Sequence, residues 1–104
     1  MKALFLGLGM TAALVSGSAM ADLELAKKSG CLACHSVEKK IVGPAWKDVG
    51  KKYAGDASAK ATLVAKVKSG GKGVWGPAPM PPYSPRVSDA NIEKLVDFVL
   101  SLGK

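Results

Sequence analysis

The sequence is poor in the residues that most often bind metals or take part in redox chemistry. Its 104 residues include one histidine and two cysteines, together with two each of tryptophan, tyrosine and phenylalanine. These three potential ligands fall one short of a structural zinc site, which needs four. The sequence also lacks any alternating β-branched run long enough for a strand, any internal repeat and any linker. An all-α protein without a structural zinc ion is therefore predicted.

The first residues have the layout of a cleaved leader. Residues 1–21, MKALFLGLGMTAALVSGSAMA, contain one basic residue at Lys2, then an apolar run, then small residues at the end. Glycine, serine and threonine interrupt the run and no charged stop-transfer segment follows, so a signal peptide cleaved after Ala21 is favoured over a membrane anchor. The remaining domain, residues 22–104, has 83 residues. A domain this small needs a disulfide, a metal or a cofactor to be comfortably stable.

Acidic residues are also scarce. Residues 22–104 contain eight acidic residues against thirteen lysines and Arg86, a formal charge of +6. Nucleic acid is not an expected partner of an exported protein. A lysine-rich surface instead suits an acidic protein partner, because complementary charges raise the encounter rate more than the affinity. The charge serves solubility as well, and it does not say which face carries the lysines.

Two helical segments are predicted in the first half of residues 22–104. A short irregular helix begins near Leu23 and runs into Cys34 with an interruption near Gly30. Residues 42–45 form a loop, and a second short helix is expected over residues 46–53, after Pro44.

Two further helices are predicted in the second half. Asp56 or Ser58 caps the third helix, and glycines 70 and 71 end it. The third helix buries one apolar face and leaves three lysines exposed; the face is Ala59, Leu63, Val64 and Val67, and the lysines are Lys60, Lys66 and Lys68. Ser88 caps a final helix that ends at Gly103. Its apolar residues recur with helical spacing; they are Ile92, Leu95, Val96, Val99 and Leu100.

A proline-rich loop separates the last two helices. Residues 70–85, GGKGVWGPAPMPPYSP, contain five prolines and four glycines in sixteen residues, so neither helix nor strand persists there. This loop carries Trp75 and Met80.

The segment GCLACH, residues 30–35, contains both cysteines and the histidine. A thioredoxin-type pair opens a helix after a strand, and no strand precedes this one. A disulfide across so short a loop adds little stability and leaves His35 without a purpose. The remaining interpretation is covalent haem attachment, for which Cys-x-x-Cys-His is the signature. On one helical turn Cys31, Cys34 and His35 project from one face, so two thioether bonds anchor the porphyrin while His35 reaches the iron.

The second iron ligand decides what such a haem does, because an open position binds gases whereas two strong ligands favour electron transfer. After loss of residues 1–21, Met80 is the only methionine and His35 the only histidine. Prolines around Met80 limit the conformational entropy lost when its thioether is held against iron. Water, an unusual lysine, or a purely core-filling role for Met80 remain as alternatives.

Four segments, GCLACH, VGPAWKDVG, GVWGPAPMPP and SDANIEKLVDFVLSLG, resemble in this order the short bacterial class I cytochromes c. The resemblance covers essentially all of residues 22–104 and implies an all-α class I fold of about four short helices around one haem c. It implies axial ligation by His35 and Met80, with a hydrogen bond from His35 Nδ1 to the Pro44 carbonyl. It also implies that Trp75 donates to a haem propionate and that Gly30 lets the terminal helices cross closely.

Three features depart from the family pattern. Ala26 stands where relatives often have an aromatic residue, so looser contact between the terminal helices is expected. Tyr83 and Ser84 follow the Met-Pro-Pro segment, where some relatives have an asparagine that hydrogen-bonds the methionine sulfur. Lys66 replaces an arginine or histidine and cannot form a bidentate contact.

The resemblance implies a monomeric periplasmic electron carrier, not an enzyme, with no stable insertion in a membrane. Its expected partners are periplasmic redox proteins that meet a lysine-rich surface at the haem edge; candidates are nitrite reductase, cytochrome c peroxidase, a terminal oxidase and a quinol-oxidising complex. The alternatives are a gas-binding or sensor c-type haem protein with a displaceable sixth ligand, and a small disulfide-stabilised binding module.

Overall fold

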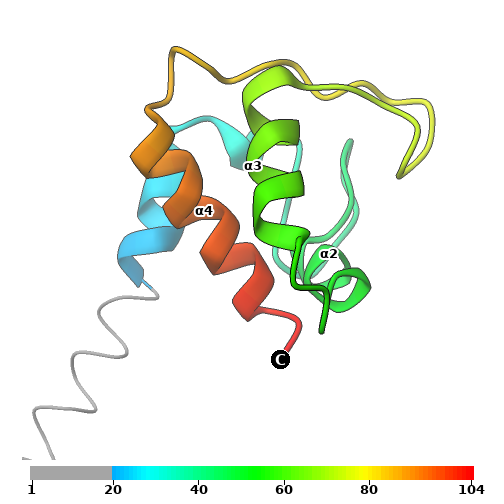
Figure 1. The fold of residues 1–104 in the computed structure, drawn as a ribbon. Helices are drawn as coiled ribbons and strands as arrows, with labels where there is room; N and C mark the ends of the chain where they lie inside the picture. Colours follow the sequence, from blue (N-terminus) through cyan, green and yellow to red (C-terminus); the bar gives the residue numbers. More distant parts are fainter. Residues whose placement is uncertain (1–19) are drawn as a thin grey trace, which may run out of the picture.

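The computed structural model describes residues 20–104 and confirms the all-α prediction (Figure 1). Residues 20–28 are helical and lead into a 3₁₀ turn, η1 (Cys31–Ala33). Three α-helices follow; they are α2 (Trp46–Lys52), α3 (Ala59–Ser69) and α4 (Asp89–Ser101). Across residues 20–104 there are isolated β-bridges but no strand.

The predicted leader lies almost entirely outside the described residues, since residues 1–19 are not among them. Cleavage after Ala21 therefore stays a prediction. Within the part of the chain that the structure describes, no helix is long and apolar enough to cross a membrane.

Helix α4 is the centre of the packing, because both α2 and α3 lie against it. Ser88 caps it as predicted, with its hydroxyl oxygen accepting from the Asn91 N–H at 3.2 Å. Four of the five predicted core residues are buried and Leu100 is half-buried, while Phe98, which the spacing argument left out, is buried too. The helix ends at Ser101, two residues before the predicted Gly103.

The N-terminus of α3 lacks the side-chain capping bond that was predicted. Ser58 occupies the N-cap position, but its side chain makes no capping bond. The carboxylate of Asp56 instead accepts from the N–H and the hydroxyl of Ser58, at 2.9 and 2.8 Å. The end of α3 is as predicted: Gly70 has φ 74°, and its N–H donates to the Lys66 carbonyl. The two later lysines of α3, Lys66 and Lys68, are half-buried rather than fully exposed.

The implied role of Gly30 is wrong. Within the described part of the chain, a Cβ on Gly30 would meet no atom within 4 Å, so the terminal helices make no close crossing there. Gly30 is needed instead for its φ of 85°, which turns the chain from the first helix into η1. A close approach of backbones is found instead between α2 and the end of α4. A Cβ on Gly50 of α2 would stand 2.6 Å from the Gly103 nitrogen and 2.7 Å from the Val99 oxygen.

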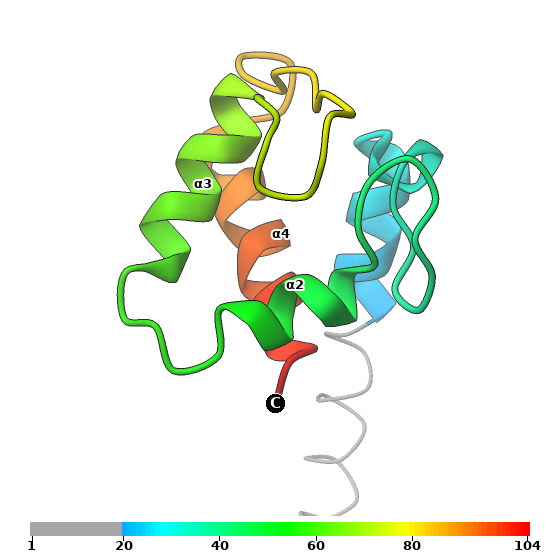
Figure 2. The same ribbon diagram turned by 90° about the vertical axis from the view of Figure 1, so that its right-hand side faces the viewer.

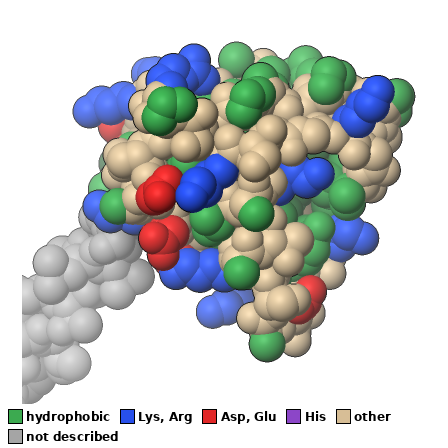
Figure 3. Space-filling model, turned by 45° about the horizontal axis from the view of Figure 1, so that its top comes forward, with side chains coloured by type: hydrophobic (Ala, Val, Ile, Leu, Met, Phe, Trp, Pro, Cys, Tyr) green, Lys and Arg blue, Asp and Glu red, His purple; other side chains and the backbone are tan. Residues whose placement is uncertain are grey.

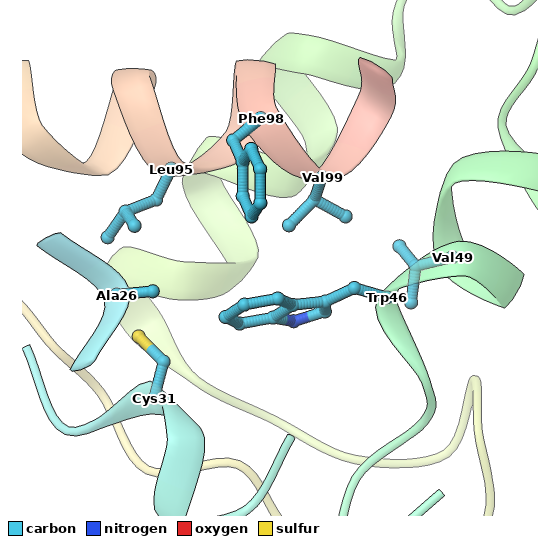
Figure 4. Packing of buried hydrophobic residues seen from close by; sticks show 7 residues of the cluster. All are labelled: Ala26, Cys31, Trp46, Val49, Leu95, Phe98 and Val99. Carbon is cyan, nitrogen blue, oxygen red and sulfur yellow. The ribbon is translucent and has the colours of Figure 1, made fainter. Parts of the chain in front are cut away.

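The core around α4 has two clusters. One surrounds Trp46 and contains Ala26, Cys31, Val49, Leu95, Phe98 and Val99 (Figure 4). Ala26, where looser contact was expected, is completely buried, and the aromatic side chains of this cluster come from α2 and α4. The second cluster is Tyr83, Val87, Ile92 and Val96, against which Met80 packs. The core thus extends from the GCLACH segment to the proline-rich loop.

Candidate functional site

The imidazole of His35 is held by the backbone of the loop that follows it. Its Nδ1 donates to the Pro44 carbonyl at 2.8 Å, so the implied hydrogen bond is present. Because a carbonyl only accepts, this bond places the proton on Nδ1 and leaves the Nε2 lone pair free to bind a metal.

Backbone hydrogen bonds explain why the loop returns to His35. The Gly43 N–H donates to the Cys34 carbonyl at 2.8 Å, and the Trp46 N–H donates to the Ser36 carbonyl at 2.9 Å. Gly43 then lies directly against the imidazole, since a Cβ there would stand 2.5 Å from His35 Cε1. The loop over residues 36–45 is therefore folded back onto the GCLACH segment.

No disulfide joins the two cysteines of this segment. Cys31 is buried and Cys34 is half-buried, and the turn between them is closed by a hydrogen bond from the His35 N–H to the Cys31 carbonyl. Burial raises the pKa of the Cys31 thiol. Two unpaired thiols are what thioether formation requires.

Met80 is fixed at the base of the proline-rich loop. Its N–H donates to the Gly71 carbonyl at 2.8 Å, and its carbonyl accepts from the Gly71 N–H at 2.9 Å. Gly70 allows this pairing, because a Cβ on it would contact the Met80 carbonyl oxygen. In Figure 2 the loop (yellow) and the segment of residues 31–45 (cyan to green) face each other.

A cavity of about 360 Å³ brings the predicted site residues together. All six line it; they are Cys31, Cys34, His35, Pro44, Trp75 and Met80. Apolar side chains of α3 and α4 form much of the rest, among them Leu63, Val67, Leu95, Val96 and Val99. The volume lies within the range of about 300–1,000 Å³ that small-molecule and cofactor sites occupy.

The polar groups of this cavity are cationic or neutral. Lys66 and Lys72 line it, and no acidic residue among residues 20–104 does. Trp75 is 39% exposed, and Lys52 Nζ lies 5.8 Å from the ring centroids of both Trp75 and Tyr53. An apolar wall with a basic edge matches a flat apolar macrocycle that carries carboxylates, so the residues present fit a haem.

Comparison with known proteins agrees with this fit. The family model for cytochrome c matches residues 23–103. The chain belongs to the cytochrome c family.

Two relatives are similar to this chain over nearly its whole length. Cytochrome c-551 of Allochromatium vinosum is 57% identical over 95 residues, which cover 91% of this chain and 100% of the relative. Cytochrome c-552 of Nitrosomonas europaea is 50% identical over 103 residues, covering 98% and 99%. The crystal structure of wild-type Nitrosomonas europaea cytochrome c552 matches with a TM-score of 0.74 and 51% identity, over 77% of this chain and 98% of that one.

The chain is thus a small class I monohaem cytochrome c, an electron carrier with one covalently attached haem c. Its cavity also contains side chains to which the sequence analysis gave no role, such as Tyr53, Thr62 and Lys72. Gly43 and Trp46 also contact the imidazole, although the sequence places them only in a loop and a helix. No periodicity marks these contacts, because they arise only when the loop folds back.

Proposed function

We propose that this cytochrome carries single electrons between periplasmic respiratory proteins, with His35 and Met80 as axial ligands and Cys31 and Cys34 as the thioether attachments. The haem supplies one iron that alternates between Fe(III) and Fe(II). The observation that carries the proposal is the cavity: its lining includes the two thiols, an imidazole with a free Nε2 and the only methionine of residues 22–104.

His35 contributes a strong and oriented donor. The hydrogen bond from Nδ1 to Pro44 fixes the tautomer and increases the basicity of the ring. A carbonyl acceptor does this without adding a charge to the cavity.

Met80 contributes a soft neutral donor on a stiff loop. The thioether favours Fe(II), and the apolar wall disfavours the extra positive charge of Fe(III), so the reduction potential lies on the high side of the haem range. The hydrogen-bonded pair with Gly71 and the prolines around Met80 hold the sulfur in place without a strong bond.

Location and partners are proposed from the leader and the charge. Residues 1–21 are interpreted as a signal peptide, which places the mature protein in the periplasm. Basic side chains, lysine or arginine, are spread among hydrophobic ones on the face viewed in Figure 3, with a few acidic side chains between them. A basic and apolar surface at the cavity edge suits brief contact with acidic redox partners, which are the nitrite reductase, peroxidase, oxidase and quinol-oxidising candidates.

The test is the Met80→Ala variant, with Val74→Ala, an exposed change in the same loop, as control. The ferric wild type and the control should show the weak long-wavelength charge-transfer band of methionine-ligated ferric haem. Met80→Ala should lose this band and bind carbon monoxide readily in the ferrous state. Persistence of the band in Met80→Ala would contradict the assignment. Ready carbon monoxide binding by the wild type would favour the gas-binding alternative, and absence of haem after maturation would favour the disulfide module.

A further inference from the structure

The hydrogen bond to Pro44 does not by itself fix the plane of the His35 ring. One such bond lets the ring turn about the Nδ1···O axis and tilt by roughly 30°, since N–H···O angles between about 150° and 180° are all favourable. Two further contacts remove this freedom, and neither of them is a hydrogen bond.

The first contact is the close approach of Gly43. A Cβ on Gly43 would stand 2.5 Å from Cε1, 2.9 Å from Nδ1 and 3.0 Å from Nε2 of His35. The glycine is needed for space and not for conformation, since Gly43 is absent from the positive-φ glycines of the described chain. The Nδ1–Cε1–Nε2 edge of the ring therefore has no room to move toward the loop.

The second contact is a stack between His35 and Trp46. Their ring centroids lie 5.5 Å apart with an interplanar angle of 23°, within the range of offset-stacked aromatic pairs. The indole is itself held in the core, since Phe98 of α4 meets it edge-on at 6.1 Å and 86° (Figure 4). Trp46 is 6% exposed and packed in the core, so the indole has little freedom to move and restricts the imidazole stacked on it.

We propose that Gly43 and Trp46 are positioning residues that set the plane of the His35 imidazole and protect its Nδ1–H···O=C bond to Pro44. The inference rests on the proposed role of His35 as an iron ligand and deepens it. A ligand held in one plane keeps the same geometry in both oxidation states. This lowers the reorganisation energy of electron transfer.

The experiment follows the His35 Nδ1 proton by NMR in the haem-loaded ferrous protein after transfer to deuterated water. Trp46→Leu should speed exchange of this proton roughly 2- to 10-fold, because the stacked cover over the ring is lost. Trp46→Phe, which keeps an aromatic face, should change the rate less than about 2-fold. Gly43→Ala should speed exchange about 10-fold or more, because the added Cβ displaces the ring. The reduction potential should rise in Trp46→Leu and Gly43→Ala, since a weaker hydrogen bond makes the imidazole a poorer donor.

Phe98→Leu is the matched control for a merely structural effect. It loosens the same indole from the α4 side and lowers global stability, but leaves the His35 and Trp46 pair in place. Its exchange rate should rise less than that of Trp46→Leu, because the indole face over the imidazole remains. Equal acceleration in Phe98→Leu and Trp46→Leu would overturn the proposal, as would an unchanged rate in Trp46→Leu. If Gly43→Ala does not mature, the tryptophan variants and this control decide alone. A wild type without the methionine-ligated ferric band would instead contradict the proposed function.

Discussion

Replacing Gly50 with alanine tests the packing of α2 on α4, because local and tertiary effects have opposite signs there. Gly50 is buried inside α2, where alanine is the better helix former by about 0.5–1 kcal/mol. Helix propensity alone thus predicts a more stable protein. The added Cβ, however, would stand 2.6 Å from the Gly103 nitrogen and 2.7 Å from the Val99 oxygen. Both atoms are backbone, so relief requires α2 to move away from α4.

Such overpacking costs about 1–3 kcal/mol, and occasionally more, which outweighs the gain in propensity. We expect a net loss of about 1–2 kcal/mol, or a fall in Tm of about 4–16 °C for a domain of this size. Thermal and denaturant unfolding of the haem-loaded protein in one fixed oxidation state measure this, with Lys51→Ala on the exposed side of α2 as control. A Gly50→Ala variant as stable as wild type, or more stable, would refute the reasoning.

The remaining predictions concern a helix cap and a buried phenol. Ser88→Ala removes the cap of α4 and should cost about 1 kcal/mol in denaturant unfolding, whereas Ser58→Ala, which removes no capping bond, should cost clearly less. Burial raises the pKa of Tyr83 above its ordinary value of 10.0, so folding favours the neutral phenol. That stabilisation is complete below pH 10 and is lost as pH rises through the folded-state pKa. Stability curves should therefore show a steeper alkaline loss for wild type than for Tyr83→Phe; parallel curves would contradict this.

The sequence was most informative where chemistry and local spacing coincide. Cys31, Cys34 and His35 are neighbours in the chain, so their meeting in one cavity needs only a single turn. Met80 could be selected because no other methionine follows the leader. The core face of α4 followed from helical periodicity, although Phe98 lies at the edge of that stripe and was left out.

Contacts between distant segments could not be predicted in the same way. A glycine in a sequence does not show whether it serves conformation or space. Gly30 needs its positive φ and has open surroundings, whereas Gly50 meets backbone from α4. Similarly, Asp56 and Ser58 were both sound capping candidates, but the hydroxyl of Ser58 is engaged by Asp56 and does not reach the helix. Each of these contacts depends on which groups lie nearby in the folded chain. The spacing of residues in the sequence does not show this.

Helix α2 shows how the stability of the fold and the geometry of the site depend on the same few contacts. A helix of seven residues is too short to be stable alone, so its position depends on tertiary contacts. Trp46 at its start lies between Phe98 and His35, and Gly50 one turn later lies against Gly103. Residues four apart share one helix face, so both contacts hold α2 against α4 from the same side. The orientation of the His35 imidazole therefore depends on the position of α2. A substitution at Gly50, which does not line the cavity, should shift Trp46 and through it the imidazole.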